Sequence, residues 1–283
     1  MIFWAGVAFF ILRLVHPVPR DLFDHKPGIG VIDLQGVMLS AEEVLADLAE
    51  FREDEAIKAV LIRIDSPGGA VGAAQEIFQD IKRTAKVKPV VASLASMAAS
   101  GGYYAALGAN AIVANPGTMT GSIGVIITFA NLEKILDKVG YRSEVIKSGE
   151  NKDIGSMTRA MTPEERGLLQ AMIDNVHHQF IQAVAESRKL SLDTVRPLAD
   201  GRIFTGSQAK EFGLVDRLGN FTDAVEVAME LAGLKGERPN LIYPEPKEFS
   251  ILELLAGEKS QSAIKLLLPN QPGLMYQWSP PVQ

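Results

Sequence analysis

The sequence predicts an α/β fold with a mostly parallel β-sheet covered by helices. In the first half of the chain, short apolar runs that are typical of strands alternate with patterns of helical period. Parallel strands need a long crossover between them, usually a helix, so this alternation favours a parallel sheet. The length of 283 residues and the 47% content of hydrophobic residues are sufficient for one large domain or two smaller ones.

Five segments have the character of strands. Each is a short apolar run, and the third leads directly into the small-residue segment around Ser100. The expected strands are residues 30–34, 59–64, 90–94, 111–114 and 123–129.

Helices are expected between these strands. Ser40 and Glu43 have the spacing of a capping box and precede an apolar stripe that continues to Phe51. A second helix presents an apolar face within residues 77–81, and a third, short helix is expected at residues 103–107.

The second half of the chain is more helical. Thr162 as N-cap, Pro163 at the first helical position and Glu165 as the capping-box glutamate predict the start of a long helix. Thr205 and Gln208 repeat the capping-box spacing before a short helix that glycine 213 ends.

Composition excludes several classes of protein. The net charge is −6 and no basic stripe is present, which argues against a nucleic-acid-binding protein. The chain has no cysteine, so disulfides, thiolate catalysis and cysteine-ligated metals are excluded. The lack of cysteine is compatible with a location outside the cytoplasm.

The N-terminal segment, residues 1–15, is apolar apart from Arg13. As a helix it would span roughly 18–22 Å, less than the ~30 Å of a bilayer core. A short membrane anchor, an anchor truncated by a misplaced start codon and a buried helix all agree with it, and we interpret it as an anchor. Arg13, Arg20 and Lys26 follow the run and by the positive-inside rule would place the body in the cytoplasm, unless a basic segment precedes the run.

The rest of the chain divides into three parts. Residues 16–28 are interpreted as a linker, residues 29–239 as one catalytic domain and residues 240–283 as a C-terminal tail. The tail is rich in proline and polar residues and contains a leucine-rich stretch at residues 251–255. We expect it to pack on a partner or a membrane surface.

A glycine turn follows the second expected strand. Gly68 and Gly69, in Ser-Pro-Gly-Gly, can bring main-chain N–H groups close to an anion beside a helix N-terminus. Such a loop can form an oxyanion hole. It can also be a plain strand–helix turn, and its spacing fits neither the phosphate-binding loop nor the dinucleotide fingerprint.

Ser100 and Gly101 follow the third expected strand. A serine at a helix start is usually an N-cap. It can also present its hydroxyl at the carboxyl edge of the sheet, where open α/β folds bind ligands. In the second case, the N–H of Gly101 would face the same point.

Lys152 is a candidate base for such a serine. A lysine acts as a base only when it is neutral, and lowering its pKa from ~10.4 to ~7 costs about 4–5 kcal/mol. Burial supplies this only if no carboxylate is close, so the side chain of Asp153 must point away. Ser122 could hold the amine by a hydrogen bond. The alternatives are a solvated loop lysine and an ordinary turn serine.

Taken together, these motifs resemble the signal peptide peptidase A family in its short, single-module form. The matching segments occur in order between about residues 29 and 232 and form a specific set: 64–69, 96–104, 120–125, 152–153, 200–202 and 213–216. The resemblance implies the Clp protease/crotonase-like fold, a spiral of ββα units. The short N-terminal segment departs from the longer anchor that is usual in the family.

The resemblance also implies roles. Ser100 corresponds to the nucleophile, Lys152 to the general base and Ser122 to the serine that positions the lysine. Gly68 or Gly69, with the N–H of Gly101, would form the oxyanion hole. No metal or nucleotide cofactor is implied.

The implied activity is that of a serine endopeptidase that cleaves residual signal peptides and other short or unfolded chains at the membrane. The implied partners are peptide substrates and further copies of the chain, in a ring whose subunits share active sites. We predict a plasma-membrane protein with an extracytoplasmic catalytic domain. Two alternatives remain: a membrane-associated scaffold that binds peptides without cleaving them, and a crotonase-like acyl-thioester enzyme.

Overall fold

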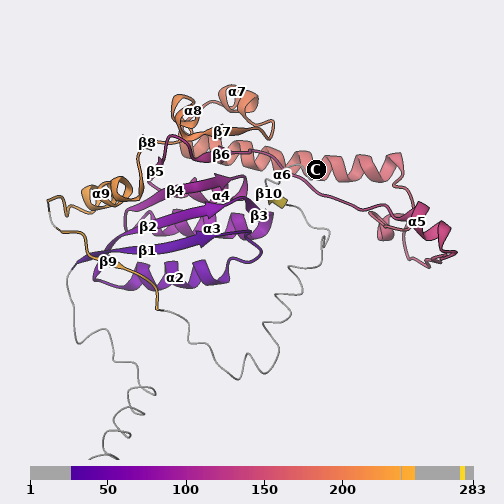
Figure 1. Ribbon diagram of the computed structural model, residues 1–283, viewed down its shortest axis with the longest axis horizontal. Helices are drawn as coiled ribbons and strands as arrows, with labels where there is room; N and C mark the ends of the chain where they lie inside the picture. The colour runs from indigo at the N-terminus through magenta and orange to yellow at the C-terminus, as the bar shows by residue number, and fades with distance from the viewer. Residues whose placement is uncertain (1–26, 237, 246–274, 278–283) are drawn as a thin grey trace, which may run out of the picture.

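The computed structural model describes residues 27–236, 238–245 and 275–277 (Figure 1). Its strands are β1 Gly28–Gln35, β2 Ile57–Ser66, β3 Gly68–Ala70, β4 Val90–Ala99, β5 Ala111–Ala114, β6 Met119–Gly121, β7 Ile203–Thr205, β8 Arg217–Leu218, β9 Leu241–Ile242 and β10 Met275–Gln277. Its helices are α2 Glu42–Glu53, α3 Val71–Thr84, α4 Gly101–Ala106, α5 Glu133–Lys138, α6 Pro163–Arg188, α7 Leu192–Val195, α8 Gly206–Glu211 and α9 Phe221–Leu231, with 3-10 turns η2 Glu150–Asp153 and η3 Arg196–Leu198.

An eight-stranded sheet lies at the centre of the fold. Its strands follow the order β7-β6-β4-β2-β1-β9, with β5 beside β4 and β8 beside β5. Strands β6 and β7 are antiparallel, and the other paired strands of this sheet are parallel. The predicted α/β class with a mostly parallel sheet is therefore confirmed.

Helices cover both faces of the sheet. Successive side chains of a strand point to opposite faces, so each strand contributes to two cores. Helices α2, α3, α4 and α6 enclose the larger core, to which Ile32 and Ile62 belong. Helix α9 packs on the opposite face against Ile29, Leu61 and Val91. Burial on both faces explains why the strands are nearly continuous apolar runs.

Strand β4 is longer than expected and has two neighbours on one side. Its first half pairs with β5, and its last three residues pair with β6. It continues past Leu94 to Ala99 and so ends directly before Ser100. This extension carries the serine to the carboxyl edge of the sheet.

Two local expectations are wrong. Residues 123–129 form no strand; one bridge at Ile126 is present there, and β6 lies earlier. The positive φ angles of Gly121 and Ser122, 79° and 50°, end the strand at that point. The helix expected after Ser40 begins at Glu42, and its N-cap is Ala41 without a side-chain hydrogen bond.

The long helix α6 begins as predicted and leaves the body of the protein. Thr162 Oγ1 accepts from Glu165 N at 3.2 Å, and Glu165 Oε2 accepts from Thr162 N at 2.9 Å, which confirms the capping box. The C-terminal part of α6 is buried around Phe180, whereas Leu168 is 52% exposed. We call residues 131–172, with α5, η2 and the start of α6, the arm; they project from one end of the sheet (Figure 1).

Parts of the C-terminal tail pack on the chain itself. Strand β9 extends the central sheet beside β1, and β10 pairs antiparallel with β3. The leucine-rich stretch 251–255 and the N-terminal segment 1–15 lie outside the described residues. Within the described part of the chain, no helix is both long and apolar enough to cross a membrane.

Candidate active site

Ser100 lies at the junction of β4 and α4 in a strained conformation. Its φ and ψ angles are 52° and −115°, and it is 1% exposed. An ordinary N-cap has extended backbone and a side-chain hydrogen bond to the helix, and Ser100 has neither. Its N–H donates to Gly121 O at 2.8 Å, which holds the strained residue in place. Strain of this kind concentrates at functional sites.

Ser122 takes an equivalent position on the neighbouring strand. Residues Met97–Ala99 of β4 pair with Met119–Gly121 of β6, and each serine follows directly after its paired segment. Ser122 also has a positive φ of 50°, is 6% exposed and donates its N–H to Arg202 O at 2.8 Å. Parallel pairing therefore brings both serines to one edge of the sheet.

The glycine turn 66–69 lies against the start of α4. Gly68 has a φ of 104°, and a methyl group built on it would lie 2.7 Å from the nitrogen of Gly101. Only glycine permits both this backbone and this approach. Ser66 Oγ orders the turn: it donates to Gly36 O at 2.6 Å and accepts from Gly68 N at 3.1 Å.

Gly69 directs its main-chain groups toward β10. On its other side, Met38 N donates to Gly68 O at 2.9 Å, and Ala70 N donates to Met38 O at 2.8 Å. The main-chain N–H and C=O groups of successive strand residues point to opposite edges of the strand. Those of Gly68 and Ala70 face Met38, so those of Gly69 face β10. Tyr276 of β10 is its partner there.

The carbonyl of Tyr276 lies in the angle between the two glycine segments. A methyl group on Gly68 would be 1.9 Å from Tyr276 O, and one on Gly101 would be 3.1 Å from it. Gly101 is the first residue of α4, so its N–H has no partner within the helix. A peptide carbonyl is thus present beside the residue that follows Ser100.

Lys152 is not part of this cluster. It belongs to η2 in the exposed arm, which extends away from α4 (Figure 1). Among the described residues, its amine has no hydrogen-bond or ion-pair partner. The structure therefore brings together Ser100, Ser122 and the glycines at 68, 69 and 101, and leaves Lys152 apart from them.

The neighbouring carboxylate of Asp153 is engaged elsewhere. It accepts from Lys147 Nζ at 2.6 Å and from Arg159 Nε at 3.1 Å. These bonds, from Arg159 first and Lys147 second, hold the pKa of Asp153 well below its usual range. The side chain of Asp153 is therefore directed to Lys147 and Arg159.

Arg159 connects this turn to the start of α6. Its guanidinium also donates to both carboxylate oxygens of Glu165, with Nη1 2.8 Å from Oε2. Together with the N–H of Thr162, it lowers the pKa of Glu165 to about 2. The turn that carries Lys152 is thus anchored to a capping box.

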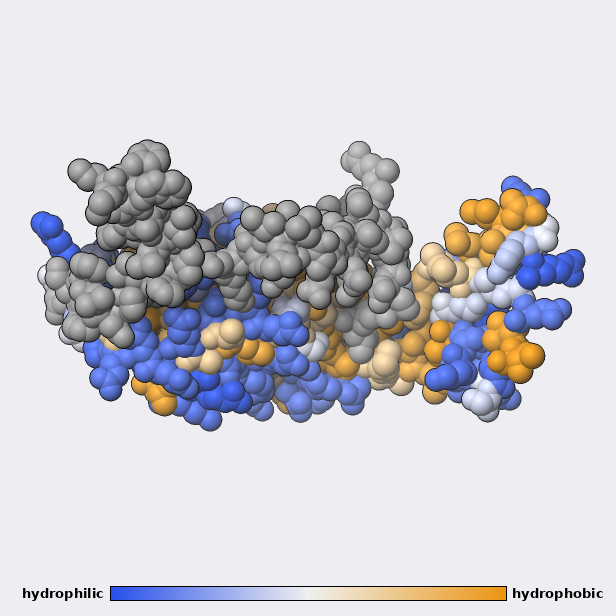
Figure 2. Space-filling model, turned by 90° about the horizontal axis from the view of Figure 1, so that it is seen from below, coloured by the Kyte–Doolittle hydropathy of each residue, from blue (hydrophilic) through white to orange (hydrophobic). Residues whose placement is uncertain are grey.

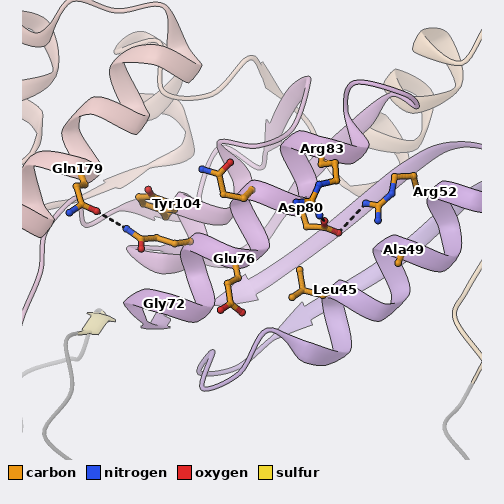
Figure 3. A pocket seen from close by; sticks show the side chains of 11 residues that line it. Leu45, Ala49, Arg52, Gly72, Glu76, Asp80, Arg83, Tyr104 and Gln179 are labelled. Atoms are coloured by element: carbon orange, nitrogen blue, oxygen red, sulfur yellow. Dashed lines mark hydrogen bonds and ion pairs between the residues drawn. The ribbon is translucent and has the colours of Figure 1, made fainter.

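A groove of about 730 Å³ lies between α2, α3 and α6, and neither Ser100 nor Ser122 is among its lining residues. Arg52 and Asp80 form an ion pair at one end, and Tyr104 and Gln179 lie at the other (Figure 3). Within the described residues, no group of three or more His, Asp or Glu side chains is arranged to hold a metal ion.

Sequence reasoning assigned no role to three participants in this site. Arg202, within the matching segment 200–202, acts through its main-chain carbonyl. Met38 acts through its main-chain groups and through its Cε, which would lie 2.9 Å from a methyl group built on Gly101. Tyr276 lies far along the chain from Gly69 and reaches it by strand pairing.

Comparison with known proteins identifies the family of the chain. Residues 82–235 match peptidase family S49. Over 206 residues, 73% of this chain and 74% of the relative, the chain is 48% identical to a putative protease of Synechocystis sp.. It is 36% identical to protease 4 of Salmonella typhi over 85% of this chain and 40% of that one, and 38% identical to a putative signal peptide peptidase SppA of Enterococcus faecium over 65% and 54%.

The range 82–235 contains both serines, β4 and α6. The chain belongs to peptidase family S49, with relatives of the SppA and protease 4 type, and it is a serine-type peptidase.

Proposed function

We propose that Ser100 is the nucleophile of this peptidase and that Lys152 of a second copy of the chain is its general base. The observation that carries the proposal is the strained, buried Ser100, which is followed by a free helix N-terminus and faces a glycine turn with a peptide carbonyl between them. This arrangement is what acyl transfer requires: a nucleophile next to main-chain donors that stabilise a developing oxyanion.

The oxyanion donors that we propose are the N–H groups of Gly101 and Gly69. Gly68 N already donates to Ser66 Oγ at 3.1 Å, so its role is to permit the close approach. Removal of one such donor typically costs about 10²–10³ in rate.

The proposed reaction has two stages. Neutral Lys152 accepts the proton of Ser100 Oγ while the oxygen attacks the peptide carbonyl and forms a tetrahedral oxyanion. The C–N bond then breaks, the leaving amine takes the proton from Lys152, and an ester on Ser100 remains. Water, deprotonated by Lys152, hydrolyses this ester and regenerates the serine. In this scheme Ser122 orients the lysine amine.

The arm supports the participation of a second copy. Lys152 lies in the arm, and the arm exposes large apolar side chains to solvent: Ile135, Val139, Tyr141, Val145, Ile146 and Met157. Figure 2 shows apolar side chains exposed on the arm. An exposed apolar patch of this extent is typical of an interaction surface. We infer that arms pack on neighbouring copies in a ring and bring Lys152 to the partner's Ser100.

The proposed substrates are residual signal peptides and other short or unfolded hydrophobic peptides, cleaved at the plasma membrane on its extracytoplasmic side. The apolar N-terminal segment supports membrane attachment, and the name of the Enterococcus relative supports the substrate class.

Peptide hydrolysis by Ser100→Ala and Lys152→Ala tests the assignment. Each variant is expected to lose at least about 10³-fold in kcat, because nucleophile and base act as one unit. Lys138→Ala is the matched control, since it removes an exposed lysine of the same arm that lies in α5, outside the turn with Lys152. Near wild-type turnover in either dyad variant would sink the proposal.

Mixing tests whether the site is shared. After subunit exchange, Ser100→Ala and Lys152→Ala chains together should recover part of the activity, because some interfaces then combine an intact serine with an intact lysine. If exchange is demonstrated by mass spectrometry and activity stays at background, the two residues do not come from different copies. A fluorophosphonate that fails to label Ser100 in the assembled protein would instead favour a peptide-binding scaffold.

A further inference from the structure

Segment 213–216, Gly-Leu-Val-Asp, has no role in the proposed reaction, although it is one of the segments that carry the family resemblance. It lies beside α4, the helix that follows Ser100. The Tyr103 hydroxyl donates to Leu214 O at 2.8 Å, and this bond joins positions that are 111 residues apart in the sequence. The segment is therefore connected directly to the helix that carries the proposed nucleophile.

Helix α4 depends on other parts of the fold for its orientation. It has six residues, whereas isolated helices shorter than about 12–15 residues are marginal in water. Ser100, its N-cap, makes no side-chain hydrogen bond to it, and its first two residues are glycines. A methyl group on Gly102 would lie 2.9 Å from Ser66 O, so the start of α4 passes close to the end of β2. The first side chain that can hold α4 after these glycines is that of Tyr103.

Tyr103 and Tyr104 hold α4 on two different sides, because successive residues of a helix point about 100° apart. The Tyr104 ring contacts Phe78 and Phe180, with ring centres 5.1 and 4.9 Å apart. Tyr103 is fully buried and donates to Leu214 O. Burial raises the pKa of Tyr103 well above its usual value, so the hydroxyl stays protonated and remains a donor. Loss of this hydroxyl would release one side of α4 and leave the contacts of Tyr104 in place.

Arg188, the last residue of α6, holds the acceptor of this bond. Its Nη1 and Nη2 donate to the two carboxylate oxygens of Asp216 at 2.9 and 2.7 Å, and its Nε donates to Gly213 O at 2.9 Å. Asp216 Oδ2 also accepts from Ile112 N of β5 at 2.7 Å. Charge-assisted bonds therefore fix both ends of the segment that contains Leu214.

We propose that Tyr103 is a positioning residue of this peptidase, and that the Arg188–Asp216 pair supports it. Tyr103 fixes α4 so that the Ser100 hydroxyl and the N–H of Gly101 keep the geometry that acyl transfer requires. The inference rests on the proposed function, which makes Ser100 the nucleophile. It concerns geometry alone: a displacement of about 1 Å at a reacting group can lower the rate about 100-fold.

Tyr103→Phe tests the inference, because it removes the hydroxyl and keeps the ring. In the full chain, kcat for peptide hydrolysis should fall about tenfold with KM within about twofold of the wild type, since the hydroxyl does not touch the substrate. The rate at which a fluorophosphonate labels Ser100 should fall by about the same factor, because the phosphoryl oxygen of the label takes the place of the oxyanion.

The final extent of labelling counts the competent sites, so kcat can be expressed per competent site. A residue with a merely structural role would lower Tm and the number of competent sites. It would leave kcat per competent site at the wild-type value, and that result for Tyr103→Phe would overturn the inference.

Arg188→Lys tests the support. Lysine keeps the charge but cannot reproduce the planar fork that binds Asp216, so kcat per competent site should fall about threefold. The double variant Tyr103→Phe with Arg188→Lys should be about as slow as Tyr103→Phe alone. Without the hydroxyl, the position of Leu214 no longer acts on α4. Two losses that multiply would show that the residues act separately and would refute the supporting role of the ion pair.

Two matched variants are the controls. Tyr243→Phe makes the same change at a tyrosine that is 47% exposed. Arg217→Lys makes the same change at an arginine whose partner, Glu230, is also at the surface. Both should keep the wild-type kcat and KM. A loss in either control as large as in the corresponding test variant would contradict the assignment.

The proposed function and this inference fail in different ways. Full turnover in Ser100→Ala would overturn the proposed function. If Ser100→Ala is inactive and Tyr103→Phe keeps the wild-type kcat per competent site, the proposed function stands and the positioning role of Tyr103 is wrong.

Discussion

Two serines with left-handed backbone stand side by side at the edge of the sheet. Ser100 and Ser122 have φ angles of 52° and 50°, and such conformations cost on the order of 1–3 kcal/mol each for residues other than glycine. The main-chain hydrogen bonds to Gly121 O and Arg202 O hold them there. Glycine would adopt the same backbone at either position without this cost. The presence of serine at both positions therefore indicates that the hydroxyl groups have a role.

The strain at Ser100 predicts an unusual order of stabilities. Ser100→Gly relieves the backbone strain, whereas Ser100→Ala keeps it. The free energy of unfolding of the glycine variant should therefore exceed that of the alanine variant by about 1 kcal/mol. This corresponds to a Tm higher by about 2–4 °C in a thermal unfolding scan. Both variants lack the hydroxyl and should be inactive.

The control for this prediction is Ser187 in α6. There the backbone is helical, so Ser187→Gly should be less stable than Ser187→Ala by about 1 kcal/mol. The same order at both positions would show that the backbone of Ser100 is unstrained in solution.

At the scale of the elements, the start of α6 holds the turn that carries Lys152. Arg159 joins Asp153 of η2 to Glu165 of the capping box, so the turn with Lys152 follows the orientation of the helix. Glu165 is 4% exposed and accepts from Arg159 and from the N–H of Thr162. We expect Arg159 to act as a positioning residue.

This anchor predicts a dependence on acid. The pKa of Glu165 is lowered to about 2 by Arg159 and Thr162, so the carboxylate stabilises the folded state above its unfolded pKa of about 4.5. Its contribution is lost as pH falls from about 4.5 through about 2. The Tm of Glu165→Gln should therefore lie below that of the wild type at pH 7 and converge with it toward pH 2.

The exposed neighbour Glu164 provides the comparison. It is in the same helical turn and outside the bonds to Arg159, so Glu164→Gln should follow the wild type over the whole range. A constant Tm difference between wild type and Glu165→Gln down to pH 2 would mean that the carboxylate charge does not stabilise the arm.

Elements whose signals are local could be predicted from the sequence. The capping boxes at Thr162 and Thr205 lie within four residues each, and both are present. Asn220 and Asp223 form the same capping box at the start of α9, and the sequence analysis does not predict it. Strand β10 could not be predicted, because three residues in a polar tail become a strand only beside the open edge of β3.

At the scale of the whole molecule, Ser100 and Lys152 belong to different parts of the fold. The sequence motifs identify both residues, since each has a characteristic neighbourhood. They contain no information on which copy of the chain supplies the lysine, because that depends on the direction of the arm. The arm exposes apolar side chains, and the amine of Lys152 has no partner among the described residues. Both observations favour a neighbouring copy as the one whose Ser100 Lys152 approaches.

The arm's apolar surface therefore predicts that assembly and catalysis fail together. Ile146 is 102% exposed and Val139 is 72% exposed, so Ile146→Glu with Val139→Glu changes no core contact. Charges at these positions oppose burial between copies. Light scattering with size-exclusion chromatography should give a smaller particle, and peptide hydrolysis should fall to the level of Lys152→Ala.

Val87→Glu, at an exposed valine on the body, should alter neither the particle size nor the rate of hydrolysis. A dissociated variant with full turnover would mean that a single copy brings Lys152 to its own Ser100.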